Sequence, residues 1–269
     1  MPTIDEIMSV MEAYAENVRE GLDERWDKLP VELYDSETYE TIGGLLARQA
    51  TLSIEFALTP MMWTGHIAPL VLRCMTDCHI TLAWILNDPA ERSKKYILYG
   101  LGQEKLQIEH LKADGDKDDE RIQAMIEMKE AWLGSQRRDF LTEVNVGNWA
   151  GLNTREMAKE SDCEGLYKFA YTPFSGAAHN MWQHVSMCNL KPCSNPLHKY
   201  HRVPTIRDIE PEPDFVYRSA KYLNRSYRVV DDKFELSCST TLPLEFWAHE
   251  MERLQESSIN SDTENDAGD

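Results

Sequence analysis

Apolar side chains recur at intervals of three and four positions along most of the chain, which is the spacing of one face of an α-helix. The first such stretch opens with Thr3 and Glu6, a pair that caps helix N-termini. Asp88 followed by Pro89 marks another helix start. The pattern predicts helices over about residues 4–27, 37–58, 60–86, 89–112, 119–142, 153–160, 161–171, 214–230 and 242–255.

Capping residues and a proline divide the middle of the chain further. Asn153 with Glu156 and Ser161 with Glu164 have the spacing of two more capping pairs. Pro173 is expected to kink the helix that precedes it or to restart it, and a restarted helix would have Thr172 as its N-cap.

Glycine and proline do not fall at the regular intervals that separate strands, so the predicted fold class is all-α, a multi-helix bundle. A single helical domain is expected over residues 1–256. Its core would span about 37–190, and a Pro-rich irregular segment and a C-terminal helical elaboration would span about 191–256. Residues 257–269 are polar and acidic and predict a disordered tail.

The formal net charge of −18 disfavours broad attraction to nucleic acid or anionic lipid. Residues 191–228 reverse this balance locally, with eight bases against four acids. Four of the bases recur at helical spacing and could follow a phosphate backbone: Arg218, Lys221, Arg225 and Arg228. The alternative is a solvated face, or a face docked on the acidic N-terminal helix.

Six cysteines without a leader-like N-terminal segment predict free thiols in the reducing cytoplasm. Residues 57–86 are long and apolar enough to cross a bilayer, but they contain two prolines and the charges of Arg73 and Asp77, so no membrane association is expected.

One loop gathers four residues of the types that bind zinc: Cys188, Cys193, His198 and His201. Their spacing departs from that of common zinc fingers, which use closely spaced cysteine pairs. A structural zinc ion and coincidence therefore both stay open, and no other cofactor is expected.

Arg73 and Asp77 are the only formal charges in residues 57–86. Their spacing of four allows an ion pair on one helical face. His66, seven residues before Arg73, is expected on the same stripe. The pair is either an internal tie between helices or an anion-binding arginine oriented by an aspartate.

A second polar stripe consists of four residues spaced four apart: Tyr167, Tyr171, Ser175 and His179. It ends in a histidine, the side chain that exchanges protons most readily near neutral pH. If this helix meets the helix of Arg73, a guanidinium and an imidazole would face one polar cavity. The alternative is that the tyrosines and the histidine are core residues with satisfied polar tips.

Three segments resemble a family of uncharacterised bacterial proteins of unknown function: DPAERSKKYILYG at 88–100, WAGLNTREMA at 149–158 and FSGAAH at 174–179. The resemblance covers roughly residues 54–201 and includes the Arg73 helix and the Tyr/Ser/His stripe. The family pattern has glutamate where this chain has Asp77. The resemblance implies an all-α form and assigns no reaction.

Arg73 and His79 also fit an Arg-x4–6-His pattern, which resembles the HEPN superfamily of helical nucleotide-binding and RNA-cleaving domains. This resemblance implies binding, and metal-free cleavage, of a nucleotide or RNA phosphodiester. Arg73 would hold the anion and Asp77 would orient it, while His179 or His79 would transfer the proton. The substrate would be positioned by His66, His79, Tyr167, Tyr171 and Ser175. For His79 the alternative is a satisfied core histidine.

Two other function classes fit the same residues. The first is a non-catalytic ligand-sensing or partner-binding module of a bacterial stress or phage-defence system, whose partner is another protein or a second copy of the chain. The second is a hydrolase in which His179 activates Ser175 and Asp77 supplies the acid. It also needs oxyanion donors, and the sequence shows none.

Overall fold

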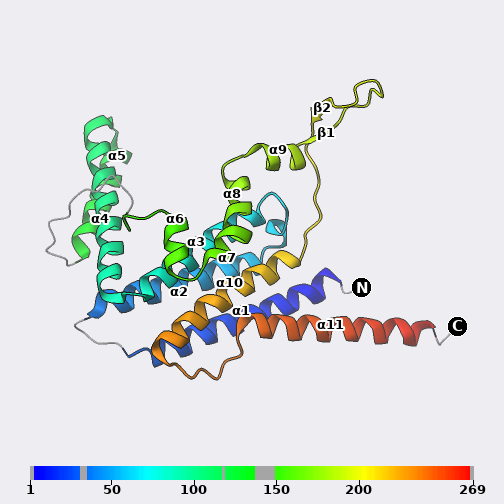
Figure 1. The fold of residues 1–269 in the computed structure, drawn as a ribbon, viewed down its shortest axis with the longest axis horizontal. Coiled ribbons are helices and arrows are strands. Elements are labelled where there is room, and N and C mark those ends of the chain that lie inside the picture. Colours follow the sequence, from blue (N-terminus) through cyan, green and yellow to red (C-terminus); the bar gives the residue numbers. More distant parts are fainter. Residues whose placement is uncertain (1–2, 31–34, 117–118, 137–148, 267–269) are drawn as a thin grey trace.

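The computed structural model describes residues 3–30, 35–116, 119–136 and 149–266, and it confirms the all-α fold class (Figure 1). The long helices are α1 (Ile4–Lys28), α2 (Ser36–Ala57), α3 (Ala68–Leu86), α4 (Pro89–Asp114), α5 (Glu120–Ser135), α10 (Asp214–Phe234) and α11 (Pro243–Asp266). The short helical segments are η2 (Pro60–Met62), α6 (Thr154–Glu160), α7 (Glu164–Leu166), η3 (Tyr167–Tyr171), α8 (Thr172–Ala178) and α9 (Trp182–Cys188).

Helix α3 lies at the centre of the bundle and packs against α2, α4, α6, α8 and α10. Its apolar side chains are completely buried at Leu72, Met75, Ile80 and Leu82. By length and composition alone, α3 could also cross a membrane, and it is the only such helix in the described part of the chain. Most of it is buried against its neighbours, as in the core helix of a globular bundle.

Helices α1, α2, α10 and α11 form a second group, in which α1 and α10 each pack against α2 and α11. The α4–α5 hairpin projects away from this group (Figure 1). The core of this group contains a charged side chain, because Arg25 of α1 is only 1% exposed. Its Nη2 donates to Asp231 Oδ2 of α10 at 2.7 Å, and its Nη1 donates to the Gly21 carbonyl at 2.8 Å. The guanidinium also stacks 4.0 Å from the ring centre of Tyr227.

The capping pairs Thr3/Glu6 and Asn153/Glu156 are confirmed, since both side-chain bonds form in each. The Ser161/Glu164 pair is wrong. The Ser161 hydroxyl donates to the Met157 carbonyl instead, and α7 begins after Cys163 without a side-chain cap.

The restart of the helix at Pro173, with Thr172 as its N-cap, is also wrong. The helix continues from α7 to α8 through η3, a π-helical turn, and the Thr172 hydroxyl donates to the Tyr167 carbonyl at 2.9 Å. The wider turn accommodates the proline ring, which in a regular helix would clash with the carbonyl four residues earlier.

The Pro-rich segment is not wholly irregular, because β1 (Leu190–Pro192) and β2 (Arg202–Pro204) form an antiparallel ribbon with Lys191 opposite Val203. Helix α11 continues to Asp266, through most of the segment for which the sequence predicts a disordered tail. A helix anchored in the core extends at one hydrogen bond per added residue, even where its sequence is polar. Residues 137–142, expected in the fifth helix, lie outside the described residues.

Asp231→Asn should lower the free energy of unfolding by about 3 kcal/mol, because it leaves the Arg25 charge buried without a carboxylate. Urea unfolding followed by circular dichroism measures this change. The neighbouring Asp232→Asn is the matched control: Asp232 is exposed, so the change should stay within about 0.5 kcal/mol. Equal effects of the two substitutions would mean that the buried ion pair does not stabilise the α1–α10 contact.

Candidate functional site

The two polar stripes of the sequence meet between α3 and the α7–η3–α8 helix. Arg73 Nε donates to Ser175 Oγ at 2.8 Å, and the guanidinium lies 3.3 Å from the ring centre of Tyr171. Ser175 in turn donates to the Tyr171 carbonyl at 2.8 Å. We call Arg73, Tyr171 and Ser175 the arginine clamp. The structure therefore brings these three predicted site residues together.

Asp77 extends the clamp along α3. Arg73 Nη1 lies 3.4 Å from Asp77 Oδ2, so the predicted i,i+4 ion pair forms. The Arg73 side chain is 16% exposed and that of Asp77 is 47% exposed, so the pair reaches the surface and is not sealed in the core. Nη2 of Arg73 has no hydrogen-bond partner among the described residues.

One further member of the stripe, Tyr167, packs against the clamp. Tyr167 stacks on Tyr171 with ring centres 4.8 Å apart, and the Tyr171 hydroxyl donates to Thr154 of α6 at 3.3 Å. Together these contacts fasten η3 to both α3 and α6.

His179 lies outside the clamp. It ends α8, its backbone N–H donates to the Ser175 carbonyl at 3.0 Å, and its side chain is exposed. Within the described part of the chain its imidazole makes no hydrogen bond and contacts neither Arg73 nor the Ser175 hydroxyl. The Ser–His pair of a hydrolase is therefore not assembled in this structure.

His79 belongs to the core. It is 5% exposed, and its Nδ1 lies 3.0 Å from the hydroxyl of Ser226 on α10. That hydroxyl also accepts a bond from Gln49 Nε2 at 2.9 Å, so the imidazole is part of a buried polar network between α2, α3 and α10. Burial, with a smaller contribution from Arg225, lowers the pKa of His79 to about 4. A neutral, buried imidazole fits the core alternative better than proton transfer to a substrate.

The four bases of α10 divide into two kinds. Arg218 pairs with Asp214 at 2.7 Å and Arg228 pairs with Glu245 at 2.8 Å. Lys221 and Arg225 form no ion pair within the described residues. They line a cleft of about 440 Å³ between α10 and the α7–η3 segment instead.

The opposite wall of this cleft comes from Leu166, Phe169 and Ala170, with Asp162 at its edge and Tyr222 beside the two bases. The ring of Phe169 is 84% exposed. We call this space the cationic cleft. Sequence reasoning identified its bases but missed Phe169, because the π-helical turn that directs that ring outward leaves no local signature in the sequence.

A second groove, of about 720 Å³, contains none of the predicted site residues. It lies between α2, α4 and α5 and is lined by Arg48, Tyr96, Tyr99, Trp132 and Trp149, among others. These residues are scattered over four segments, so no local motif could have indicated the groove.

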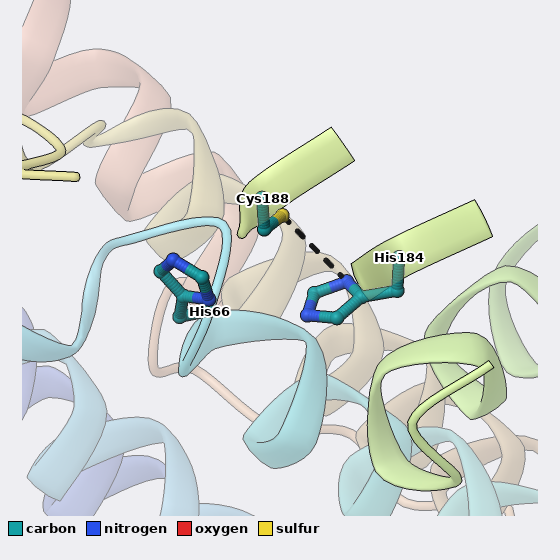
Figure 2. A group of neighbouring side chains, drawn as sticks. All are labelled: His66, His184 and Cys188. Atoms are coloured by element: carbon teal, nitrogen blue, oxygen red, sulfur yellow. Dashed lines mark hydrogen bonds between the residues drawn. The ribbon is translucent and has the colours of Figure 1, made fainter. Parts of the chain in front are cut away.

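The four expected zinc ligands do not form one group. Cys193, His198 and His201 lie in the β1–β2 hairpin, with ligand atoms within 4.8 Å of one another. Cys188 lies instead with His184 and with His66, again within 4.8 Å (Figure 2). His66 is therefore not on the Arg73 stripe, because α3 begins only at Ala68 and His66 belongs to the preceding loop. The i,i+4 spacing of His184 and Cys188 was the signal in the sequence that could have identified His184.

These features define an all-α bundle with an arginine clamp at its centre and a cationic cleft beside it. Residues 39–193 match a family of unknown function, DUF5677, and because the match covers more than half of the 269 residues, the chain belongs to that family. No curated protein and no solved structure matches the chain.

His79 should make the protein less stable in mild acid. Its pKa is about 4 in the folded chain against an ordinary value of 6.5, so the stability that it contributes is complete above pH 6.5 and is lost as the pH falls toward 4. The loss at pH 4 should be on the order of 3 kcal/mol. His79→Gln should remove this part of the pH dependence, as measured by urea unfolding at a series of pH values.

The exposed His110 provides the control, because its side chain has no hydrogen bond or ion pair among the described residues, and His110→Gln should leave the pH dependence of wild type unchanged. Identical pH profiles for wild type and His79→Gln would show that His79 does not titrate with a lowered pKa.

Proposed function

We propose that this protein binds a nucleotide or single-stranded RNA through its phosphate groups, in the cationic cleft. The observation that carries the proposal is the contrast on α10. Arg218 and Arg228 form ion pairs with acidic side chains. Lys221 and Arg225 face the cleft and form no ion pair with any residue that the structure describes. Unneutralised bases that line a concave surface favour an anionic ligand.

The composition of the cleft supports a nucleotide over a simple anion. Phe169 offers an exposed ring on the wall opposite the bases, and nucleobases stack on such rings with little sequence preference. Asp162 at the edge can accept hydrogen bonds from the amino groups of a base. Phosphate, stacking and base-edge contacts are therefore all available within one cleft.

The strongly acidic chain restricts where such a ligand binds. A net charge of −18 repels polyanions from most of the surface, so only a local basic cleft attracts them. This favours a short single-stranded segment or a mononucleotide over a duplex, whose phosphates would extend beyond the cleft.

Replacing both cleft bases, as Lys221→Gln with Arg225→Gln, should weaken binding of fluorescein-labelled oligouridine about 100-fold or more, because each charge-assisted bond is worth about 1.5–3 kcal/mol. Fluorescence polarisation measures the dissociation constant. The dependence of log K on log salt should become shallower by about 1.4, or about 0.7 for each lost phosphate contact.

The matched control removes the same charge from the same helix: Arg218→Gln with Arg228→Gln should change the affinity by less than about 3-fold. Equal weakening by the two double variants would indicate diffuse attraction to α10 and would contradict binding in the cleft. Absence of binding by the wild-type protein to both oligouridine and ATP would end the proposal.

Cleavage of the bound phosphodiester is a second candidate, and it is favoured by the position of His179 one helical turn after Ser175, the residue that Arg73 holds. His179 would remove the proton of a 2′-hydroxyl, whose oxygen then attacks phosphorus. The bond to the 5′-oxygen breaks, that oxygen takes a proton from water, and a cyclic phosphate results. The free Nη2 of Arg73 would stabilise the charge on the phosphate. This assignment keeps Arg73 of the HEPN-like pattern but replaces its histidine, since His79 is buried in the core.

His179→Asn should reduce cleavage of the same oligouridine at least about 100-fold while its affinity stays unchanged, since general acid–base catalysis contributes factors of that size. Denaturing gels of end-labelled RNA give the rate, and the expected product ends in a cyclic phosphate. If wild type binds RNA without cleaving it, or if the variant cleaves at the wild-type rate, cleavage by His179 is excluded and binding alone stands.

A further inference from the structure

Helix α9 carries two metal-ligand side chains that point toward a third on a distant loop. Figure 2 shows His184 and Cys188 on α9 with His66 opposite them, on the loop that precedes α3. Cys188 Sγ lies 3.9 Å from His184 Nδ1, and the ligand atoms of all three residues lie within 4.8 Å of one another. His66 lies more than a hundred positions before the other two residues in the sequence, so the fold brings it to them.

This spacing is close to that of a zinc site. With zinc–nitrogen bonds of about 2.0 Å and zinc–sulfur bonds of about 2.3 Å, the ligand atoms of a tetrahedral ion are about 3.3–3.6 Å apart. Rotations of side chains that are only half-buried would close the remaining gap of a few tenths of an ångström to about 1.5 Å. One thiol with two imidazoles is a ligand set that suits zinc, and three protein ligands leave the fourth position for water.

The surroundings of the three residues leave their polar atoms available. Apart from the contact between Cys188 and His184, the described residues offer these rings and the thiol no side-chain hydrogen bond.

Helix α9 has little apolar packing to hold it in place. It has seven residues and none of them is buried, and its own Trp182 and Met187 are each 71% exposed. Helices this short are unstable without tertiary packing, and α9 packs only on α8 and β1 to any extent. A metal bond to the loop before α3 would supply what apolar burial does not.

We propose that His66, His184 and Cys188 bind one zinc ion, which fastens α9 to the loop preceding α3. The site differs from the set expected from the sequence, because it takes Cys188 away from the hairpin ligands and adds two histidines. It does not depend on the proposed nucleotide binding, because none of its residues lines the cationic cleft.

Cobalt substitution of the full-length protein tests the proposal. Metal-free protein loaded with Co²⁺ should show a thiolate-to-cobalt charge-transfer band and the intense visible bands of a tetrahedral ion. Cys188→Ser should abolish the charge-transfer band, and His66→Asn should weaken metal binding by more than about 100-fold, beyond the loss usual for a residue that only supports a ligand. Cys193→Ser, a cysteine of the hairpin, is the matched control and should keep the band.

Partial loss of the band in each cysteine variant would indicate a second ion in the hairpin and would still support the site at Cys188. A band that keeps its full intensity after Cys188→Ser, or that Cys193→Ser alone removes, would overturn the proposal. So would elemental analysis of the purified protein that finds copper or no metal in place of zinc.

A measurement on the wild-type protein tests the site without relying on variants, which could misfold. Zinc should protect Cys188 of the wild-type protein from alkylation by iodoacetamide, and removal of the metal with a chelator should expose it at least about 10-fold, as read by mass spectrometry. The exposed Cys74 should react equally in both states. Equal alkylation of Cys188 with and without zinc would refute the site.

Discussion

Among the residues that the structure describes, Arg73 is the one side chain of α3 that hydrogen-bonds to the α7–η3–α8 segment. Its guanidinium lies flat on Tyr171, donates to Ser175 and pairs with Asp77. A stacked, partly desolvated guanidinium contributes about 1–2 kcal/mol beyond its hydrogen bonds. Because η3 forms one wall of the cationic cleft, this contact helps to position the proposed nucleotide site. It also helps to position the proposed zinc site, because α8 leads into α9.

The cationic cleft joins two parts of the chain with different relationships to known proteins. Its aromatic wall, around Phe169, lies inside the segment that matches the family of unknown function, whereas Lys221 and Arg225 lie on α10, beyond that match. The arginine clamp and the three proposed zinc ligands lie wholly within it. The charge of the cleft is thus supplied by the C-terminal elaboration, and its shape by the family domain.

The sequence predicts well those features that depend on neighbours along a helix. The helix positions, the Thr3/Glu6 and Asn153/Glu156 caps and the Arg73–Asp77 pair all follow from spacings of three or four residues. It also indicates that the Arg73 helix and the Tyr/Ser stripe belong together, because a charge in an apolar helix needs a polar partner. The features that the sequence does not predict depend on contacts between segments that are distant along the chain. The π-helical turn accommodates Pro173 while η3 packs on α3, and His66 meets Cys188 only because a loop and α9 converge.

The two proposed sites are held in place by different interactions, so one of them can lose its structure while the other keeps it. Residues of the cleft walls, such as Leu166, Ala170 and Tyr222, are buried in the hydrophobic core, and the arginine clamp adds a polar tie, so that region keeps its shape without any metal. Helix α9 has no buried residue, so its position would depend on the three ligands and on the chain connections at its ends. Loss of zinc should therefore loosen α9 and the hairpin that follows it, while the cationic cleft, built on η3 and α10, stays formed.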